Sequence, residues 1–247
     1  MIKFFRQIRY NLMEQNKTGR YFKYAIGEII LVVIGILIAL QINNWNQNRL
    51  QHQNELKFLK GIQSEFKLNK AYLENAKKKN TEALKTGRSI MSLMNKDIET
   101  LKRINTDSLI FQIFEVGGFE ISENTVLEIM QVGQLQHLEN EKLKSLILDW
   151  TQHKNRIERT RQNMDRKQDY LVDYLMSRYP LKNIDRYGIL AWENDSEIEI
   201  NKYTIFSDLE FENIVDDFLY NLASYDIRIT DFLQVIDGIL ENSTDTQ

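Results

Sequence analysis

The longest uninterrupted apolar run of the chain lies near its N-terminus. Every residue from Ile29 to Leu40 is apolar or glycine, and Glu28 is the only charge between Tyr24 and Leu40. If Tyr24 and Trp45 mark the two interfaces, the run reaches the roughly 17–20 residues that a transmembrane helix needs. The pattern therefore predicts a turn and one membrane-spanning helix within residues 17–48.

After the span, apolar residues recur in steps of three and four, which is typical of amphipathic helices. The first series predicts one long helix, or two collinear ones, and its phase slips around residues 77–81, where a stutter, a bend or a hairpin would fit. Its members are Leu59, Ile62, Phe66, Leu73, Ala76, Leu84, Met91, Met94, Ile98 and Leu101.

Further helices follow from the same spacing and from their end signals. Short helices are expected over Leu109 to Val116 and from Ser122 or Asn124 to Gly133, and a long one from Leu143 until just before Pro180. The most regular stripe belongs to the last helix, which Asp208 would cap. It consists of Phe211, Val215, Phe218, Leu222, Tyr225, Ile229, Phe232, Ile236 and Leu240.

These elements define the predicted fold class, which is mainly α. We expect one transmembrane helix followed by an antiparallel bundle of three to four long helices over residues 49–247. Ile198 and Ile200 alternate with acids, so a small β-hairpin within residues 188–206 is also expected. The single proline and 43% hydrophobic residues agree with long helices and a folded core.

Charge gives the expected membrane topology. Residues 1–28 hold six bases and two acids, whereas the remaining chain holds 26 bases and 33 acids. The positive-inside rule therefore places the N-terminus in the cytoplasm and the body outside it, as in a signal-anchor protein. A cleaved signal peptide is the alternative, but Leu37 and Ile38 before Ala39 do not form a small-x-small cleavage site.

The first 16 residues form a predicted basic amphipathic helix. Lys3, Arg6 and Arg9 alternate with apolar residues at helical spacing, so we expect this arm to lie on anionic lipid and not to bind nucleic acid. Tyr24 and Trp45 would complete the membrane anchoring. Gly27, Gly35 and Ala39 are small residues through which two spans could associate, or they simply face lipid.

Motifs for catalysis or cofactors are missing from the sequence. Cysteine is absent, and His52, His137 and His153 have no metal-binding spacing. No phosphate-binding glycine loop or Gly-x-Ser-x-Gly elbow occurs. The acids from Glu193 to Glu199 lack the spacing of a calcium loop. We therefore expect no metal, no cofactor and no enzymatic activity.

One polar cluster is a candidate contact for an anion or a partner. It lies on the predicted helix that ends before Pro180, and Arg161 falls at an expected inner position of the bundle. The alternative is that these bases pair with acids of neighbouring helices. The cluster consists of Lys154, Arg156, Arg159, Arg161, Arg166 and Lys167.

Two segments resemble a known family. The run KTGRYFKYAIGEIILVVIGILIALQINNWNQNR (17–49) is similar to the N-terminal signature of a family of uncharacterised single-span bacterial membrane proteins, a domain of unknown function. The segment TVLEIMQVGQLQHLENEKLKSLILDW (125–150) resembles its central pattern. Together they cover about a quarter of the chain. The resemblance implies an inner-membrane protein with a helical periplasmic domain, and it implies no activity.

Two functional hypotheses follow. In the first, the protein is a non-enzymatic, membrane-anchored periplasmic helical module that scaffolds or regulates an envelope complex. Its partners would be membrane lipid and either another protein or a second copy of the chain. In the second, the body is a ligand-binding, sensor-like bundle that acts through a membrane partner.

Overall fold

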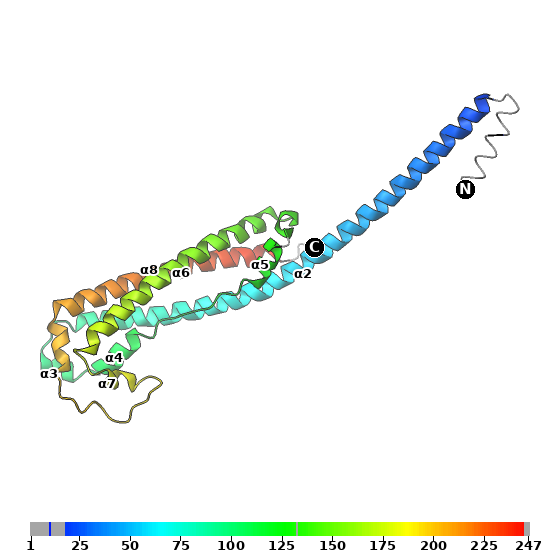
Figure 1. The fold of residues 1–247 in the computed structure, drawn as a ribbon. Coiled ribbons are helices and arrows are strands. Elements are labelled where there is room, and N and C mark those ends of the chain that lie inside the picture. The colour runs from blue at the N-terminus through cyan, green and yellow to red at the C-terminus, as the bar shows by residue number, and fades with distance from the viewer. Residues whose placement is uncertain (1–9, 11–17, 132, 245–247) are drawn as a thin grey trace. The chain divides into compact units, whose positions relative to one another are not determined.

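The computed structural model describes residues 10, 18–131 and 133–244, and the chain divides into two units, 1–57 and 58–247. Its described elements are helical, as predicted for a mainly α protein (Figure 1). They are α2 (Thr18–Ser92), α3 (Ile98–Lys102), α4 (Thr106–Ile113), α5 (Asn124–Gln131), η1 (Gln134–His137), α6 (Glu141–Met176), α7 (Leu181–Asp185), η2 (Lys202–Ser207) and α8 (Leu209–Asn242).

The N-terminal unit contains the apolar run, which is helical throughout. The large apolar side chains from Ile29 to Leu40 are each about half exposed or more, and no other part of the described chain covers them. Among the described residues, one helix is thus long and apolar enough to span a membrane.

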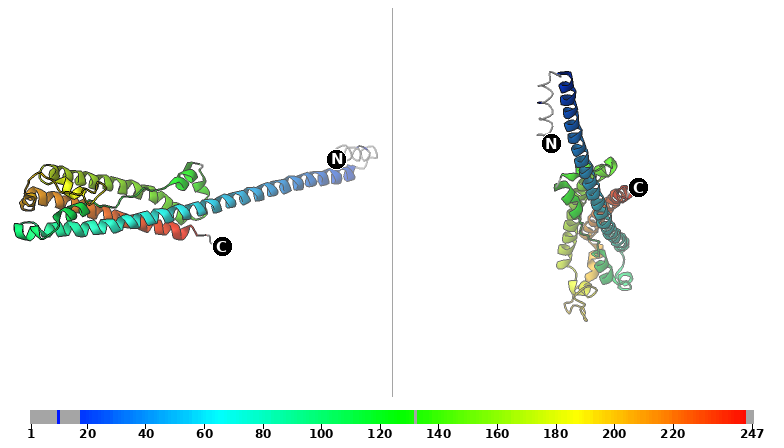
Figure 2. Two further views of the ribbon diagram at one scale, coloured as in Figure 1. Left: turned by 90° about the horizontal axis from the view of Figure 1, so that it is seen from below. Right: turned by 90° about the vertical axis from the view of Figure 1, so that its right-hand side faces the viewer.

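Three long helices form the second unit: α6, α8 and the part of α2 from Phe58 onward (Figure 2). Lys70 pairs with Asp237 and Lys77 with Thr230, so residue numbers rise along α2 as they fall along α8. Trp150 contacts Phe232 and Lys167 pairs with Asp217, so α6 and α8 are antiparallel as well. Consequently α2 and α6 run parallel, each packed against the central α8.

The core follows the predicted stripe of α8. All of its residues from Phe211 to Ile236 are at most 1% exposed, and only Leu240 at its end is half-buried. Trp150 of α6 lies between Phe66 of α2 and Phe232 of α8, with ring centroids 4.6 and 4.4 Å apart. Contacts between aromatic rings therefore link all three helices at this level.

The helix α2 runs without a break through residues 77–81, so no hairpin occurs at the phase slip. Its end, however, comes earlier than the apolar spacing predicted. Asn95 adopts a left-handed conformation with φ 54°, which asparagine tolerates beyond a helix C-terminus. Asp97 then caps the separate helix α3, which carries Ile98 and Leu101.

The hairpin predicted within residues 188–206 is wrong. These residues, all of which the structure describes, form an irregular loop followed by η2, and they contain no strand. A two-stranded hairpin needs packing on one face to be stable. Ile198 and Ile200 instead remain exposed, and Ala191 turns the backbone with φ 45°.

Candidate functional site

An extended segment covers the side of the bundle between α2 and α6. We call residues 115–123 the strap (Figure 1). The strap amide of Gly117 donates to Asn80 Oδ1 at 2.9 Å, and that of Ser122 donates to Asn69 Oδ1 at 3.0 Å. Asn69 and Asn80 are eleven helical residues apart, a rise of about 16 Å. Gly117 and Ser122 are five extended residues apart, a length of about 17 Å. The two pairs of residues can therefore face each other along α2.

The strap is also held by charged side chains on both flanks. On α2, Glu65 accepts hydrogen bonds from the Ser122 hydroxyl and from the Thr125 amide, at 2.6 and 2.9 Å. On α6, Lys154 forms an ion pair with Glu123. The strap therefore takes the place of a fourth helix.

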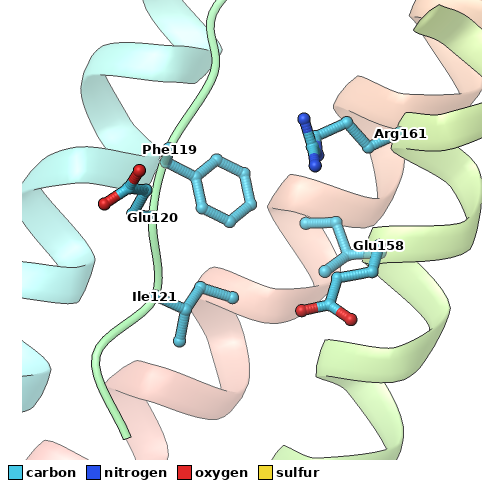
Figure 3. A pocket seen from close by; sticks show the side chains of 6 residues that line it. Phe119, Glu120, Ile121, Glu158 and Arg161 are labelled. Atoms are coloured by element: carbon cyan, nitrogen blue, oxygen red, sulfur yellow. The ribbon is translucent and has the colours of Figure 1, made fainter.

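A cavity of about 360 Å³ opens between the strap and α6 (Figure 3). We call it the strap pocket. Figure 3 shows that the side chains of Phe119, Ile121, Glu158 and Arg161 extend toward it, whereas the Glu120 carboxylate turns toward α2. Ile157 completes its lining.

Arg161 is the only base among the described residues that line this pocket. Its guanidinium bonds to Asp165 Oδ2 at 3.4 Å, one turn along α6. Burial raises the pKa of the Asp165 carboxyl, and Arg161 opposes that shift.

Tyr225 of α8 lies behind the pocket and is fully buried. Its ring stacks on Phe119 at a centroid distance of 6.4 Å, and its hydroxyl has no hydrogen-bond partner among the described residues. Burial raises the pKa of this hydroxyl, and the charges of Arg161 and Asp165 act on it.

The basic residues predicted as a cluster do not share one surface. Lys154 pairs with Glu123 of the strap, and Lys167 with Asp217 of α8. Arg166 bonds to Asn163. Arg156 and Arg159 are exposed, with the latter bonded to the Asn155 carbonyl. Only Lys154 and Arg161 face the strap.

The expectation that Arg161 points inward is wrong, because 44% of its side chain is exposed. The core stripe of α6 passes through Ile157 and Met164 and meets α8. The flank that carries Arg161 faces the strap and its pocket instead of another helix, so a charged residue fits there.

A second unusual surface is the loop of residues 187–201 between α7 and η2, which we call the tip loop. It leaves six large apolar side chains exposed: Tyr187, Ile189, Leu190, Trp192, Ile198 and Ile200. Asp195 fastens it to Arg186, and the Ser196 amide donates to Asn183 Oδ1 at 2.8 Å. Glu193, Glu197 and Glu199 form no ion pair with any described residue.

The predicted membrane residues are partly within the described chain. Lys3, Arg6 and Arg9 lie outside it, while Tyr24 and Trp45 belong to α2, with Trp45 exposed. Gly27, Gly35 and Ala39 also belong to α2. A Cβ added at either glycine would meet nothing within 4 Å.

Metal-ligating residues do not come together in the part of the chain that the structure describes. His153 stacks on Phe232 and bonds to the Asp149 carbonyl, and His52 is exposed. His137 belongs to η1. The acids 193–199 belong to the tip loop.

The strap pocket and the exposed apolar tip were not predicted from the sequence. The strap has no helical period, and α2 holds it mainly through Asn69, Asn80 and Glu65. These three polar residues lie on an otherwise apolar face and are 7% exposed or less in the structure. Their presence on that face was the only sequence feature that could have indicated the strap.

These features define a mainly α-helical protein that combines one helix apolar enough for a membrane with a three-helix bundle. Residues 28–115 match a family of unknown function, DUF6090, in agreement with the resemblance of the N-terminal signature. The matched range ends before the second similar segment, 125–150. No match is found among curated proteins or solved structures.

Proposed function

We propose that the protein is a non-enzymatic, membrane-anchored helical module that scaffolds or regulates a protein complex through its tip loop. The observation that carries this proposal is the exposure of six large apolar side chains in a loop that is fastened to the bundle. Exposed apolar clusters with polar surroundings are typical of protein-binding surfaces.

The chemistry of the tip loop favours a partner surface that is apolar and basic. Trp192 and the isoleucines offer contact area, and tryptophan is enriched among residues that dominate binding energy. The three carboxylates that form no ion pair with a described residue belong to the same loop and would attract lysine or arginine. The same charges disfavour an anionic lipid surface.

The apolar run of α2 supports the proposal that the protein is anchored in a membrane. Its side chains need a nonpolar environment, which no part of the described chain provides. With the basic N-terminal arm, this supports a bacterial inner-membrane location with the N-terminus in the cytoplasm and the body in the periplasm. Protease added to spheroplasts should then digest the body. If digestion occurs only after the inner membrane is permeabilised, the body lies in the cytoplasm and the proposed orientation is wrong.

Cross-linking in membranes tests the scaffold proposal. A partner cross-linked to the full-length protein is identified by mass spectrometry and purified. The double variant Ile189→Ser, Ile198→Ser should weaken its binding by about tenfold or more, because both side chains lie in the tip loop. Ile227→Ser is the matched control, since Ile227 is 58% exposed on α8 outside the loop. Equal binding by all three proteins would refute a role for the tip loop.

A further inference from the structure

We propose that the strap pocket binds a small zwitterion, namely an α-amino acid with an apolar side chain. The pocket combines one base, one acid that points into it and three apolar side chains within a cavity of about 360 Å³. This volume lies at the lower end of the range of about 300–1,000 Å³ found for small-molecule sites. The inference is independent of the tip loop and its partner.

Arg161 is the residue that would hold the carboxylate. A guanidinium has five N–H donors in a planar fork that matches a carboxylate. Only one bond, the 3.4 Å contact with Asp165, engages this group in the described structure. The remaining donors extend toward the pocket (Figure 3).

Glu158 is the residue that would hold the ammonium group. It precedes Arg161 by three residues on α6, so both side chains lie on the same helix face. The two form no ion pair with each other in the described structure, and Arg161 contacts Asp165. In an α-amino acid both charged groups are bonded to one carbon, which suits two neighbouring side chains of opposite charge.

Phe119, Ile121 and Ile157 would receive the apolar side chain of the ligand. They come from both walls of the pocket, and Phe119 rests on the buried ring of Tyr225. A ligand with only a carboxylate would be repelled by Glu158, and one with only an ammonium group by Arg161. The lining therefore selects a molecule that carries both charges.

Equilibrium binding to the full-length protein in nanodiscs tests the proposal. The probes are L-leucine, 4-methylpentanoate, which lacks the ammonium group, and 3-methylbutylamine, which lacks the carboxylate. L-leucine or another apolar amino acid should bind saturably, and each analogue at least about tenfold more weakly, a difference of about 1.4 kcal/mol.

The variants Arg161→Gln and Glu158→Gln should each weaken L-leucine binding by about tenfold or more. Arg159→Gln is the matched control, because Arg159 is an exposed base of α6 that does not line the pocket. Thermal midpoints show whether each variant folds. The proposal fails if no apolar amino acid binds saturably up to about 1 mM. It also fails if 4-methylpentanoate binds as well as L-leucine, or if Arg161→Gln and Arg159→Gln bind alike.

Discussion

At the residue scale, Gly117 is a point at which the strap packs tightly against α2. A Cβ there would lie 2.3 Å from the Ala76 carbonyl oxygen and 2.4 Å from the Ala76 Cα, so the strap would have to move. We expect Gly117→Ala to lower the free energy of unfolding by roughly 1–3 kcal/mol, as overpacking does. Thermal or denaturant melts measure it.

Gly118→Ala provides the control, because a Cβ at Gly118 meets nothing within 4 Å. Its melt should match that of the wild type. If both glycine variants lose the same stability, the loss reflects general effects of alanine in the strap and not contact with Ala76.

Tyr225 gives a second prediction at this scale. Its hydroxyl is buried without a partner among the described residues, and a buried unsatisfied donor costs about 1–3 kcal/mol. Tyr225→Phe keeps the stacking on Phe119 and removes the hydroxyl, so its thermal midpoint should rise. Tyr220→Phe, at a residue that is 72% exposed on the same helix, should leave the midpoint unchanged. A lower midpoint for Tyr225→Phe would mean that the hydroxyl has a bonding partner.

At the element scale, α2 and α8 meet at a polar level formed by Lys77, Asn80 and Asp226. Burial raises the pKa of the Asp226 carboxyl, while Lys77 and Asn80 oppose the shift. The folded state therefore holds this proton more tightly than the unfolded chain. The stability that the group contributes is full below its unfolded pKa and is lost as the pH rises through the folded value.

Asp226→Asn should accordingly melt at a higher temperature than the wild type at pH 7. The difference should shrink as the pH falls toward about 4, where the unfolded carboxyl takes up its proton. Asp216→Asn, an exposed position of the same helix, should show no such pH-dependent gain. If Asp226→Asn is less stable at pH 7, attraction to Lys77 outweighs the cost of burial.

The same elements show how far the sequence predicts the fold. The α8 stripe was predicted correctly because a single face packs against both other helices over its whole length. Asp208 was also predicted as its cap, and it accepts the Glu210 amide at 2.9 Å. The position of Arg161 was mispredicted because α6 meets a strap on that flank, and the spacing of apolar residues does not report an extended neighbour.

At the scale of the whole molecule, the mainly α class and the single apolar span followed directly from hydrophobic spacing. The strap pocket did not, since it depends on Phe119 and Arg161 meeting across 42 residues of sequence. The tip loop was misread as a hairpin because alternation indicates a strand only where one face becomes buried. Both surfaces that we propose to be functional thus lie in segments without a regular hydrophobic period.

The core shared by the three long helices should unfold as one cooperative unit. Phe218 is completely buried on α8 and belongs to the core that all three long helices share. Phe218→Asp would bury an unpaired charge at a cost of several kcal/mol, which approaches the total stability of a domain. We therefore expect loss of the cooperative thermal transition. The neighbouring variant Asp217→Asn removes only a partly exposed pair with Lys167, worth at most about 1 kcal/mol, and should melt near the wild type. A cooperative melt of Phe218→Asp near that of Asp217→Asn would show that α8 does not form the centre of the bundle.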